Sequence, residues 1–140
     1  MAPPSAAPDP TDRLFVGSIG KCFRVLETLG AHGAPMTLTA LAAAAGLDRS
    51  ATQRIPHTLG VLGSLRQHPE SRAWSLGTRL IEFGHAVLST DGLREVALPH
   101  LDALNRRCGE TVNLMELEGH EIVYVARFPS RHAVSVDLHV

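Results

Sequence analysis

Residues 36–54 have the sequence MTLTALAAAAGLDRSATQR, and this stretch decides the fold. Thr37 is a predicted N-cap for an alanine-rich helix, Gly46 is placed to make a tight turn, and Asp48 is a predicted N-cap for a second helix. Arginine and glutamine side chains follow on the first turns of that second helix. The pattern predicts a helix-turn-helix, in which the second helix enters the major groove of DNA and presents its N-terminal side chains to base edges.

The segment before this motif is predicted to be a helix preceded by a tail. Residues 18–31 carry apolar side chains at helical spacing, with Ser18 as the expected N-cap and Gly33 just after the helix end. The side chains expected on its inward face are Ile19, Cys22, Phe23, Leu26 and Leu29. Residues 1–16 contain four prolines and are expected to form a disordered tail.

The segment after the motif is predicted to complete a winged helix. Three apolar side chains are expected to anchor the second helix of the motif to the core: Ile55, Leu59 and Leu62. Residues 64–67 and 73–76 have the pattern of short strands and flank a polar tip at 68–72, an arrangement typical of a wing. Trp74 is expected to pack this wing onto the helices. The winged helix-turn-helix domain is therefore expected over residues 17–77.

Two more helices are predicted beyond the wing. Residues 78–91 are predicted to form a linker helix with a broad apolar surface, which we expect to mediate dimerisation. The side chains expected in that interface are Leu80, Ile81, Phe83, Val87 and Leu88. Residues 93–107 predict a further helix, which Pro99 should kink or divide. Its expected apolar stripe consists of Leu93, Ala97, Leu101, Leu104 and Cys108.

The remainder of the chain changes to the two-residue period of β-strands. Residues 111–117 and 121–128 predict a hairpin, and residues 132–138 predict a third strand. The expected fold class is therefore α+β. It comprises an N-terminal winged helix-turn-helix, a linker helix and an incomplete sheet-containing domain over residues 92–140.

Charge is distributed unevenly along this chain of 140 residues, whose net charge is only −1. Residues 49–73 contain four arginines against one acidic residue, whereas residues 76–140 contain six arginines against nine acidic residues. A basic first part and an acidic second part fit a DNA-facing module joined to one that does not face DNA. No stretch approaches the ~18 apolar residues of a membrane span, and no signal peptide is visible. We therefore expect a cytoplasmic protein that associates with the nucleoid when it binds DNA.

The order of these elements resembles the IclR family of bacterial transcription regulators. The segments that carry the resemblance are SIGKCFRVLE at 18–27, LAAAAGL at 41–47, Arg54, Thr58 with Leu59, Leu62 with Gly63, WSLGTRL at 74–80 and GETVNL at 109–114. The resemblance implies a homodimer or tetramer with an N-terminal winged helix for operator DNA. It also implies a C-terminal GAF-like α/β domain for a small effector, often an organic acid or an aromatic catabolite, with repression as the commonest sign of regulation.

Two features depart from the family pattern. Residues 92–140 would supply only the opening helix and first strands of the effector domain. We therefore expect an incomplete effector pocket and a C-terminally truncated member. Pro56 lies in the middle of the predicted recognition helix, where it removes the hydrogen bond to the Thr52 carbonyl and costs ~3 kcal/mol or more.

The predicted DNA contacts lie on the recognition helix and the wing. They are Arg49, Ser50, Thr52, Gln53, Arg54, His57, Arg66 and Arg72. Arg49 is expected to contact phosphate, and Arg54 either phosphate or a guanine edge. Arg66 and Arg72 are expected to touch phosphate or the minor groove. The alternative for each of these side chains is a purely solvated surface residue.

Other chemistry is poorly supported by the sequence. Glu116, Glu118, His120 and Glu121 gather at a predicted turn without the ligand spacing of a metal site, so they are expected to be solvated. Cys22 and Cys108 are expected to be buried, reduced thiols. Cys108 has no visible orienting partner for nucleophilic catalysis, and no glycine-rich phosphate loop is present. We therefore expect no enzyme activity, no cofactor and no metal.

Two alternatives to sequence-specific DNA binding stay open at this point. A truncated member with a damaged recognition helix could act as an interaction protein that heterodimerises with an intact paralogue. It could also be a fragment with no function of its own. Pro56 discriminates between these hypotheses: DNA binding is favoured if the recognition helix tolerates the proline, and the alternatives gain if the proline melts the helix.

Overall fold

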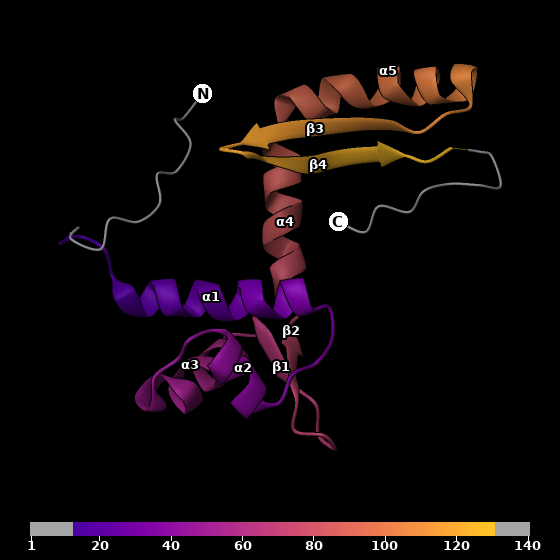
Figure 1. The fold of residues 1–140 in the computed structure, drawn as a ribbon. Helices are drawn as coiled ribbons and strands as arrows, with labels where there is room; N and C mark the ends of the chain where they lie inside the picture. The colour runs from indigo at the N-terminus through magenta and orange to yellow at the C-terminus, as the bar shows by residue number, and fades with distance from the viewer. Residues whose placement is uncertain (1–12, 131–140) are drawn as a thin grey trace. The chain divides into compact units, whose positions relative to one another are not determined.

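A computed structural model describes residues 13–130 and shows a mixed helix-and-strand fold (Figure 1). Contacts divide the chain into two compact units at the boundary between Gly84 and His85. We call residues 13–84 the winged-helix unit and residues 85–130 the hairpin unit. The elements in chain order are α1 (Gly17–His32), α2 (Leu38–Ala44), α3 (Arg49–Val61), β1 (Leu65–Gln67), β2 (Trp74–Leu76), α4 (Arg79–Thr90), α5 (Gly92–Cys108), β3 (Val112–Glu118) and β4 (Glu121–Phe128).

Local capping chemistry sets the helix boundaries of the winged-helix unit. Thr37 accepts a hydrogen bond from the Ala40 N–H at 3.3 Å, and Asp48 accepts one from the Ala51 N–H at 2.9 Å. Gly33 follows α1 with φ 68°, and Gly46 makes the turn between α2 and α3 with φ 60°. These four predictions are confirmed. The prediction of Ser18 as the N-cap of α1 is wrong, because the helix begins at Gly17 after Val16, which has no capping side chain.

The core of the winged-helix unit is centred on Val25 of α1 and Leu41 of α2, both fully buried. The buried cluster consists of Val25, Leu29, Met36, Leu41, Ala45, Ala51, Ile55, Leu59, Leu65 and Trp74. Ile19, Phe23 and Leu62 were expected in this core, but all three are more than half exposed. The inward face of α1 is rotated toward Val25, and Leu62 lies just after the end of α3, so the predicted anchors are wrong at these positions.

The wing is a short antiparallel hairpin whose register pairs Leu65 with Leu76 and Gln67 with Trp74. The segment before α2 adds a bridge, because the backbones of Met36 and Trp74 exchange hydrogen bonds of 2.9 and 2.7 Å. Trp74 is buried, and its ring lies so close to Gly60 of α3 that a Cβ there would be 3.0 Å from it. The prediction that Trp74 packs the wing onto the helices is confirmed.

The hairpin unit places α5 beside the antiparallel pair β3–β4 (Figure 1). Pro99 lies inside α5, which continues to Cys108 and is not divided. The predicted stripe of α5 is wrong at Leu93, Leu104 and Cys108, which are exposed, whereas Ala97 and Leu101 are half-buried and Asn105 is the buried residue of this helix. The helix therefore turns a partly polar face toward the strands.

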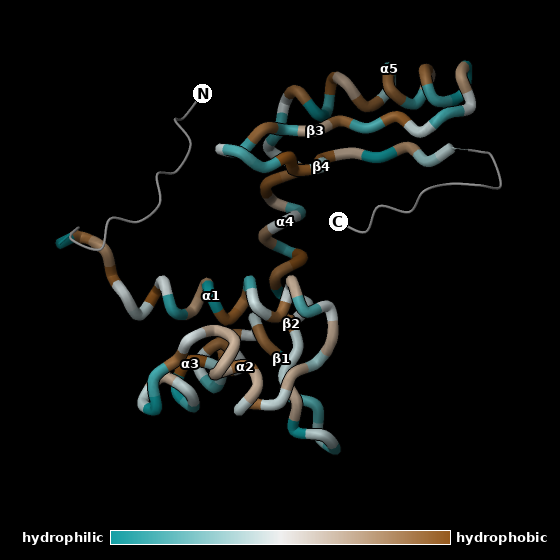
Figure 2. Tube along the Cα trace, viewed as in Figure 1, coloured by the Kyte–Doolittle hydropathy of each residue, from teal (hydrophilic) through white to brown (hydrophobic). Residues whose placement is uncertain are grey.

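Some predicted elements are exposed to solvent, and others lie outside the described residues. The linker helix α4 has no buried residue, and Figure 2 shows hydrophobic positions recurring along it. Cys22 is half-buried rather than buried. The predicted strand at 132–138 and most of the predicted tail lie outside the described residues. Within residues 13–130, none of the helices is long and apolar enough to cross a membrane.

Candidate nucleic-acid interface

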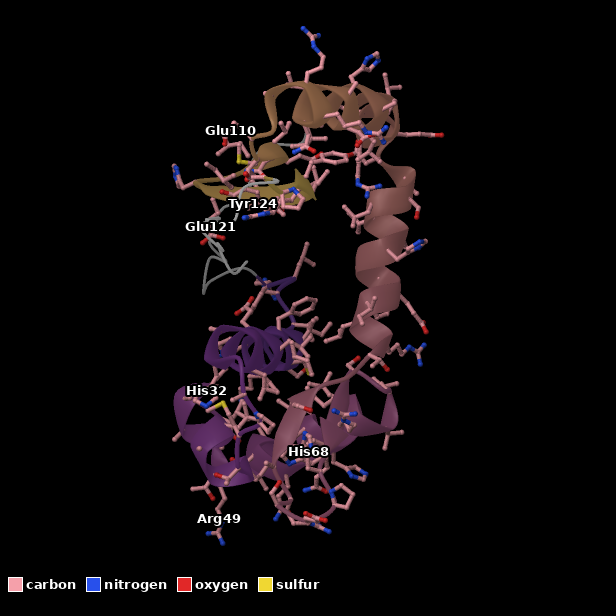
Figure 3. All side chains as sticks on the ribbon, turned by 90° about the vertical axis from the view of Figure 1, so that its right-hand side faces the viewer. His32, Arg49, His68, Glu110, Glu121 and Tyr124 are labelled. Atoms are coloured by element: carbon pink, nitrogen blue, oxygen red, sulfur yellow. The ribbon has the colours of Figure 1, made fainter. Side chains whose placement is uncertain are left out.

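Helix α3 has one buried face and one exposed face. Ala51, Ile55 and Leu59 recur at four-residue spacing and are buried in the core. Arg49, Gln53 and His57 recur at the same spacing on the other face and are all exposed. Figure 3 shows Arg49 extending away from the body of the unit. The structure therefore brings three of the predicted DNA contacts together on one solvent-facing stripe.

Arg54 lies at the edge of that stripe on the side of α1. Its exposed side chain lines a shallow groove between α1 and α3, together with Ser18 and Lys21 of α1 and Thr58 of α3. A guanidinium at the flank of a recognition helix is suited to a DNA strand that borders the major groove. The structure therefore separates Arg54 from the three side chains on the central stripe.

Ser50 and Thr52 already donate hydrogen bonds within α3. The Ser50 hydroxyl donates to the Asp48 carboxylate at 2.7 Å, and the Thr52 hydroxyl donates to the Asp48 carbonyl at 2.9 Å. Ser50 is exposed, but Thr52 is half-buried beside the core-facing residues. Ser50 can still accept a hydrogen bond from a ligand, whereas Thr52 is not brought onto the exposed stripe.

Asp48 connects the start of α3 to α1. One carboxylate oxygen accepts from Ser50 and from the Ala51 N–H, and the other pairs with the ammonium group of Lys21. The Lys21 ammonium, followed by these two donors, holds the pKa of the Asp48 carboxyl well below its ordinary value. The role of Asp48 as a cap could be predicted from the sequence, but its pairing with Lys21 could not. The two residues lie 27 positions apart, beyond any local pattern.

Pro56 is enclosed in the core, with almost none of its surface accessible, and α3 runs through it without interruption from Arg49 to Val61. Proline has no N–H, so the Thr52 carbonyl lacks its usual helical donor. Pro56 therefore affects the buried side of α3 and leaves the exposed stripe intact.

The wing carries Arg66 on β1 and Arg72 near its tip, both exposed. Arg72 adopts φ 58°, a left-handed conformation that is uncommon for a residue with a side chain. The tip is held by hydrogen bonds from the Arg72 N–H to the His68 carbonyl at 2.9 Å and from the Gln67 amide to the Arg72 carbonyl at 3.0 Å. The His68 ring also lies 3.0 Å from the Ser75 hydroxyl. These hydrogen bonds hold in place the part of the wing from which both arginine side chains extend.

The predicted dimerisation residues of α4 form an exposed apolar surface. Ile81, Phe83 and Val87 are 70%, 57% and 68% exposed, while Leu80 and Leu88 are half-buried. Arg79 at the start of the helix donates to the Leu62 carbonyl at 3.2 Å, which joins α4 to the residue that follows α3. An apolar helix surface of this extent is typical of a contact with another protein chain.

The acidic turn of the hairpin unit shows no metal-binding arrangement. Glu116, Glu118, His120 and Glu121 are all exposed around the turn between β3 and β4. Among residues 13–130, no three histidine, cysteine, aspartate or glutamate side chains converge as metal ligands would.

Two further residues that the sequence did not single out organise the hairpin unit. The Asn105 amide donates to the carbonyls of Glu110, Phe128 and Pro129 at 2.7, 3.3 and 3.0 Å. The register of the hairpin shifts between Leu114 and Met115, which leaves Val125 as the extra residue of a bulge. Arg94 of α5 donates to the Val125 carbonyl at 2.9 Å. No sequence pattern could have revealed these contacts, because each depends on how the helix and the hairpin pack.

Comparisons with known proteins agree with this arrangement. Residues 18–69 match the IclR helix-turn-helix domain, and residues 85–140 match the C-terminal domain of the bacterial transcriptional regulator IclR. The chain is 31% identical to the Pca regulon regulatory protein of Pseudomonas putida over 100% of this chain and 50% of that protein. It is 30% identical to the transcriptional repressor IclR of Escherichia coli over 84% of this chain and 43% of that protein.

A solved structure gives the same relationship. An IclR homologue from Microbacterium hydrocarbonoxydans, complexed with 4-hydroxybenzoate, superposes with a TM-score of 0.71 at 29% identity, covering 88% of this chain and 51% of that one. The chain thus spans about half the length of the relatives that it matches. The segment that matches the helix-turn-helix domain lies in the winged-helix unit, and the segment that matches the C-terminal domain begins where the hairpin unit begins. The chain belongs to the IclR family of bacterial transcriptional regulators.

Proposed function

We propose that this protein is a sequence-specific DNA-binding regulator of transcription, and that it acts as a repressor. The observation that carries the proposal is the exposed stripe of Arg49, Gln53 and His57 on α3, next to a wing that bears two exposed arginines. Repression is supported by the relative in Escherichia coli that is named a repressor. The unbroken α3 favours this proposal over heterodimerisation with a paralogue, because Pro56 lies on the buried side of the helix.

In this proposal α3 lies in the major groove, and the wing follows the backbone. Gln53 and His57 read base edges from the centre of the stripe, with Ser50 as an acceptor beside them. Arg49 binds phosphate, and Arg54 binds phosphate or a guanine edge. Arg66 and Arg72 of the wing bind phosphate or the minor groove. Thr52 supports the first turn of the helix and contributes least to the contact, because it is half-buried.

We propose that the chain is divided into three functional parts. Residues 17–77 form the DNA-binding domain, residues 78–91 the linker helix, and residues 92–140 part of an effector-binding domain. The protein is proposed to be a homodimer in which α4 packs against the α4 of a second copy through Leu80, Ile81, Phe83, Val87 and Leu88. A dimer doubles the DNA contacts and fixes the spacing of two half-sites.

We propose that the effector of this regulator is a small organic or aromatic acid. The support is the Microbacterium relative, which was solved with 4-hydroxybenzoate. The 46 described residues of the hairpin unit contain a single buried residue, Asn105, so they supply at most part of such a pocket. An effector would act on DNA binding by changing the geometry of the dimer.

A binding titration against the DNA upstream of the protein's own gene tests the proposal. The affinity should fall steeply with salt concentration, because each phosphate contact releases counterions and contributes about −0.9 to the slope of log K against log salt. Arg54→Ala should weaken binding and reduce that slope by about 1 if the arginine contacts phosphate. A guanine contact would instead relax the preference for one base pair, which a set of substituted operators would detect.

Arg107→Ala is the matched control, because Arg107 is an exposed arginine of α5 in the other unit. Its affinity should equal that of the wild type. An equal loss in both variants would mean that binding follows overall charge and does not involve α3. If the wild type does not bind DNA at any salt concentration but forms a mixed dimer with an intact paralogue, the proposal that this chain binds DNA is wrong.

A further inference from the structure

The first turn of α3 is tied to α1 by a charged contact that no local sequence pattern contains. Asp48 uses one oxygen to cap α3 and the other to pair with the Lys21 ammonium. Ser50 adds a hydrogen bond of 2.7 Å to the capping oxygen. The side chains of Lys21 and Asp48 are 34% and 50% exposed, so the pair lies at the protein surface and not in the core.

The place of this contact bears on DNA binding. Asp48 immediately precedes Arg49, the first residue of the exposed stripe, so its carboxylate lies beside the surface proposed to approach phosphate groups. An unpaired carboxylate there would repel the DNA backbone and oppose the arginine next to it. The Lys21 ammonium removes most of that repulsion. It also restrains the first turn of α3, where the proposed base contacts begin.

We propose that Lys21 is a positioning residue for DNA binding, which acts through Asp48 to orient the first turn of α3 and to neutralise the carboxylate beside it, without touching DNA. This inference rests on the proposed function. It separates Lys21 from Arg49 and Arg54, which act directly on the nucleic acid. Lys21 therefore behaves as part of the Asp48 pair and does not act as an independent cation.

A double-mutant cycle in the full chain tests the inference. Lys21→Met should raise the Kd for operator DNA about three- to tenfold. Asp48→Asn keeps the cap, since asparagine caps helices as well as aspartate does, but it removes the repelling charge together with the ion pair, so its Kd should rise by less than that of Lys21→Met. Lys21→Met should then have no further effect in the Asp48→Asn background. Lys21→Arg should restore most of the wild-type affinity.

The competing explanation is a direct phosphate contact. In that case Lys21→Met would cost the same in both backgrounds and would reduce the salt slope by about 0.9, which would overturn the positioning role. An unchanged Kd in Lys21→Met would also overturn it. Circular dichroism of each variant establishes that the helices remain folded, so a loss of affinity cannot be attributed to unfolding.

A titration of the free protein gives a readout that does not depend on DNA. The Asp48 carboxyl, followed by NMR, should titrate well below its ordinary pKa of 3.8 in the wild type and move toward that value in Lys21→Met. An ordinary pKa in the wild type would overturn the inference. Binding by the wild type without coupling in the cycle would overturn the role of Lys21 and leave the proposed function standing, whereas no binding by the wild type would overturn both.

Discussion

The two units of this chain are held together in different ways. The winged-helix unit buries a continuous apolar cluster in which Val25 and Leu41 are inaccessible to solvent. Among the described residues of the hairpin unit, no hydrophobic side chain is buried, and Asn105 is the one buried residue. Leu117 and Ile122, which pair across β3 and β4, are 75% and 59% exposed.

This difference has a simple physical origin. Three helices and a wing enclose a core from several sides within about 60 residues, whereas one helix can cover only one face of a two-stranded hairpin. The hairpin unit compensates with polar contacts to backbone carbonyls, such as those of Asn105 and Arg94. We therefore expect the winged-helix unit to be the more stable part of the chain. The following substitutions, from the largest expected effect to the smallest, test that contrast.

Leu41→Ala should have the largest effect, because it empties a fully enclosed position in the core. Substitutions of this kind lower the free energy of unfolding by about 2–5 kcal/mol. Trp74, the single tryptophan of the chain, lies in the same core, so its fluorescence during urea unfolding reports this unit. Leu117→Ala in the exposed hairpin is the matched control and should change that unfolding by less than about 0.5 kcal/mol. Similar losses in the two variants would contradict the contrast.

Asn105→Leu should destabilise the hairpin unit by about 1–3 kcal/mol, because it removes the donor to three backbone carbonyls. Hydrogen exchange should become faster at the amides of β3 and β4. The Trp74 unfolding transition should not move. Asn113→Leu is the matched control, because it replaces the same residue type near the start of β3. Asn113 is half-buried, and its amide oxygen has no partner in the described structure, so its replacement should destabilise the hairpin unit less than Asn105→Leu does. Unchanged exchange in Asn105→Leu would show that apolar contacts hold this unit.

Pro56→Ala should stabilise the winged-helix unit, since alanine restores a donor for the Thr52 carbonyl inside α3. Removing proline from the helix interior is favourable, but two effects partly offset this gain: the unfolded chain with alanine has more conformational entropy, and the smaller side chain fills less of the core. We therefore expect the free energy of unfolding to rise by about 1–2 kcal/mol. Alanine is the sharper test than leucine here, because Pro56 is fully enclosed and a larger side chain would overpack the core. A lower urea midpoint in Pro56→Ala would mean that the packing of the proline ring outweighs the missing hydrogen bond.

The pH dependence of the Asp48 contact should give the smallest effect. The pKa of this carboxyl is lowered in the folded protein, so its stabilising contribution is present above the unfolded value of 3.8 and is lost as the pH falls toward the folded value. The difference in melting temperature between the wild type and Asp48→Asn should therefore shrink between about pH 6 and about pH 2. A difference that is constant over this range would mean that the charge of Asp48 contributes nothing to folding.

Much of the fold could be predicted because short-range chemistry controls it. The caps Thr37 and Asp48, and the turn at Gly46, depend on side chains within three or four positions, so the sequence contains the whole signal. Helix faces were less predictable. In α1 and α5 the chain offers apolar residues on more than one face, and periodicity cannot say which face meets the core. Phe23 and Leu104 were misplaced for this reason, since both proved exposed.

By itself the sequence determined the order of the elements, their boundaries within a few residues, and the exposed polar stripe of α3. These follow from capping, periodicity and turn chemistry, which act between near neighbours. Only the tertiary structure decided that Pro56 points into the core, that Lys21 pairs with Asp48, and that Asn105 joins α5 to the hairpin. Some of these contacts join groups far apart in the sequence, and others depend on how a helix is rotated about its axis. Both are determined only when the elements pack against one another.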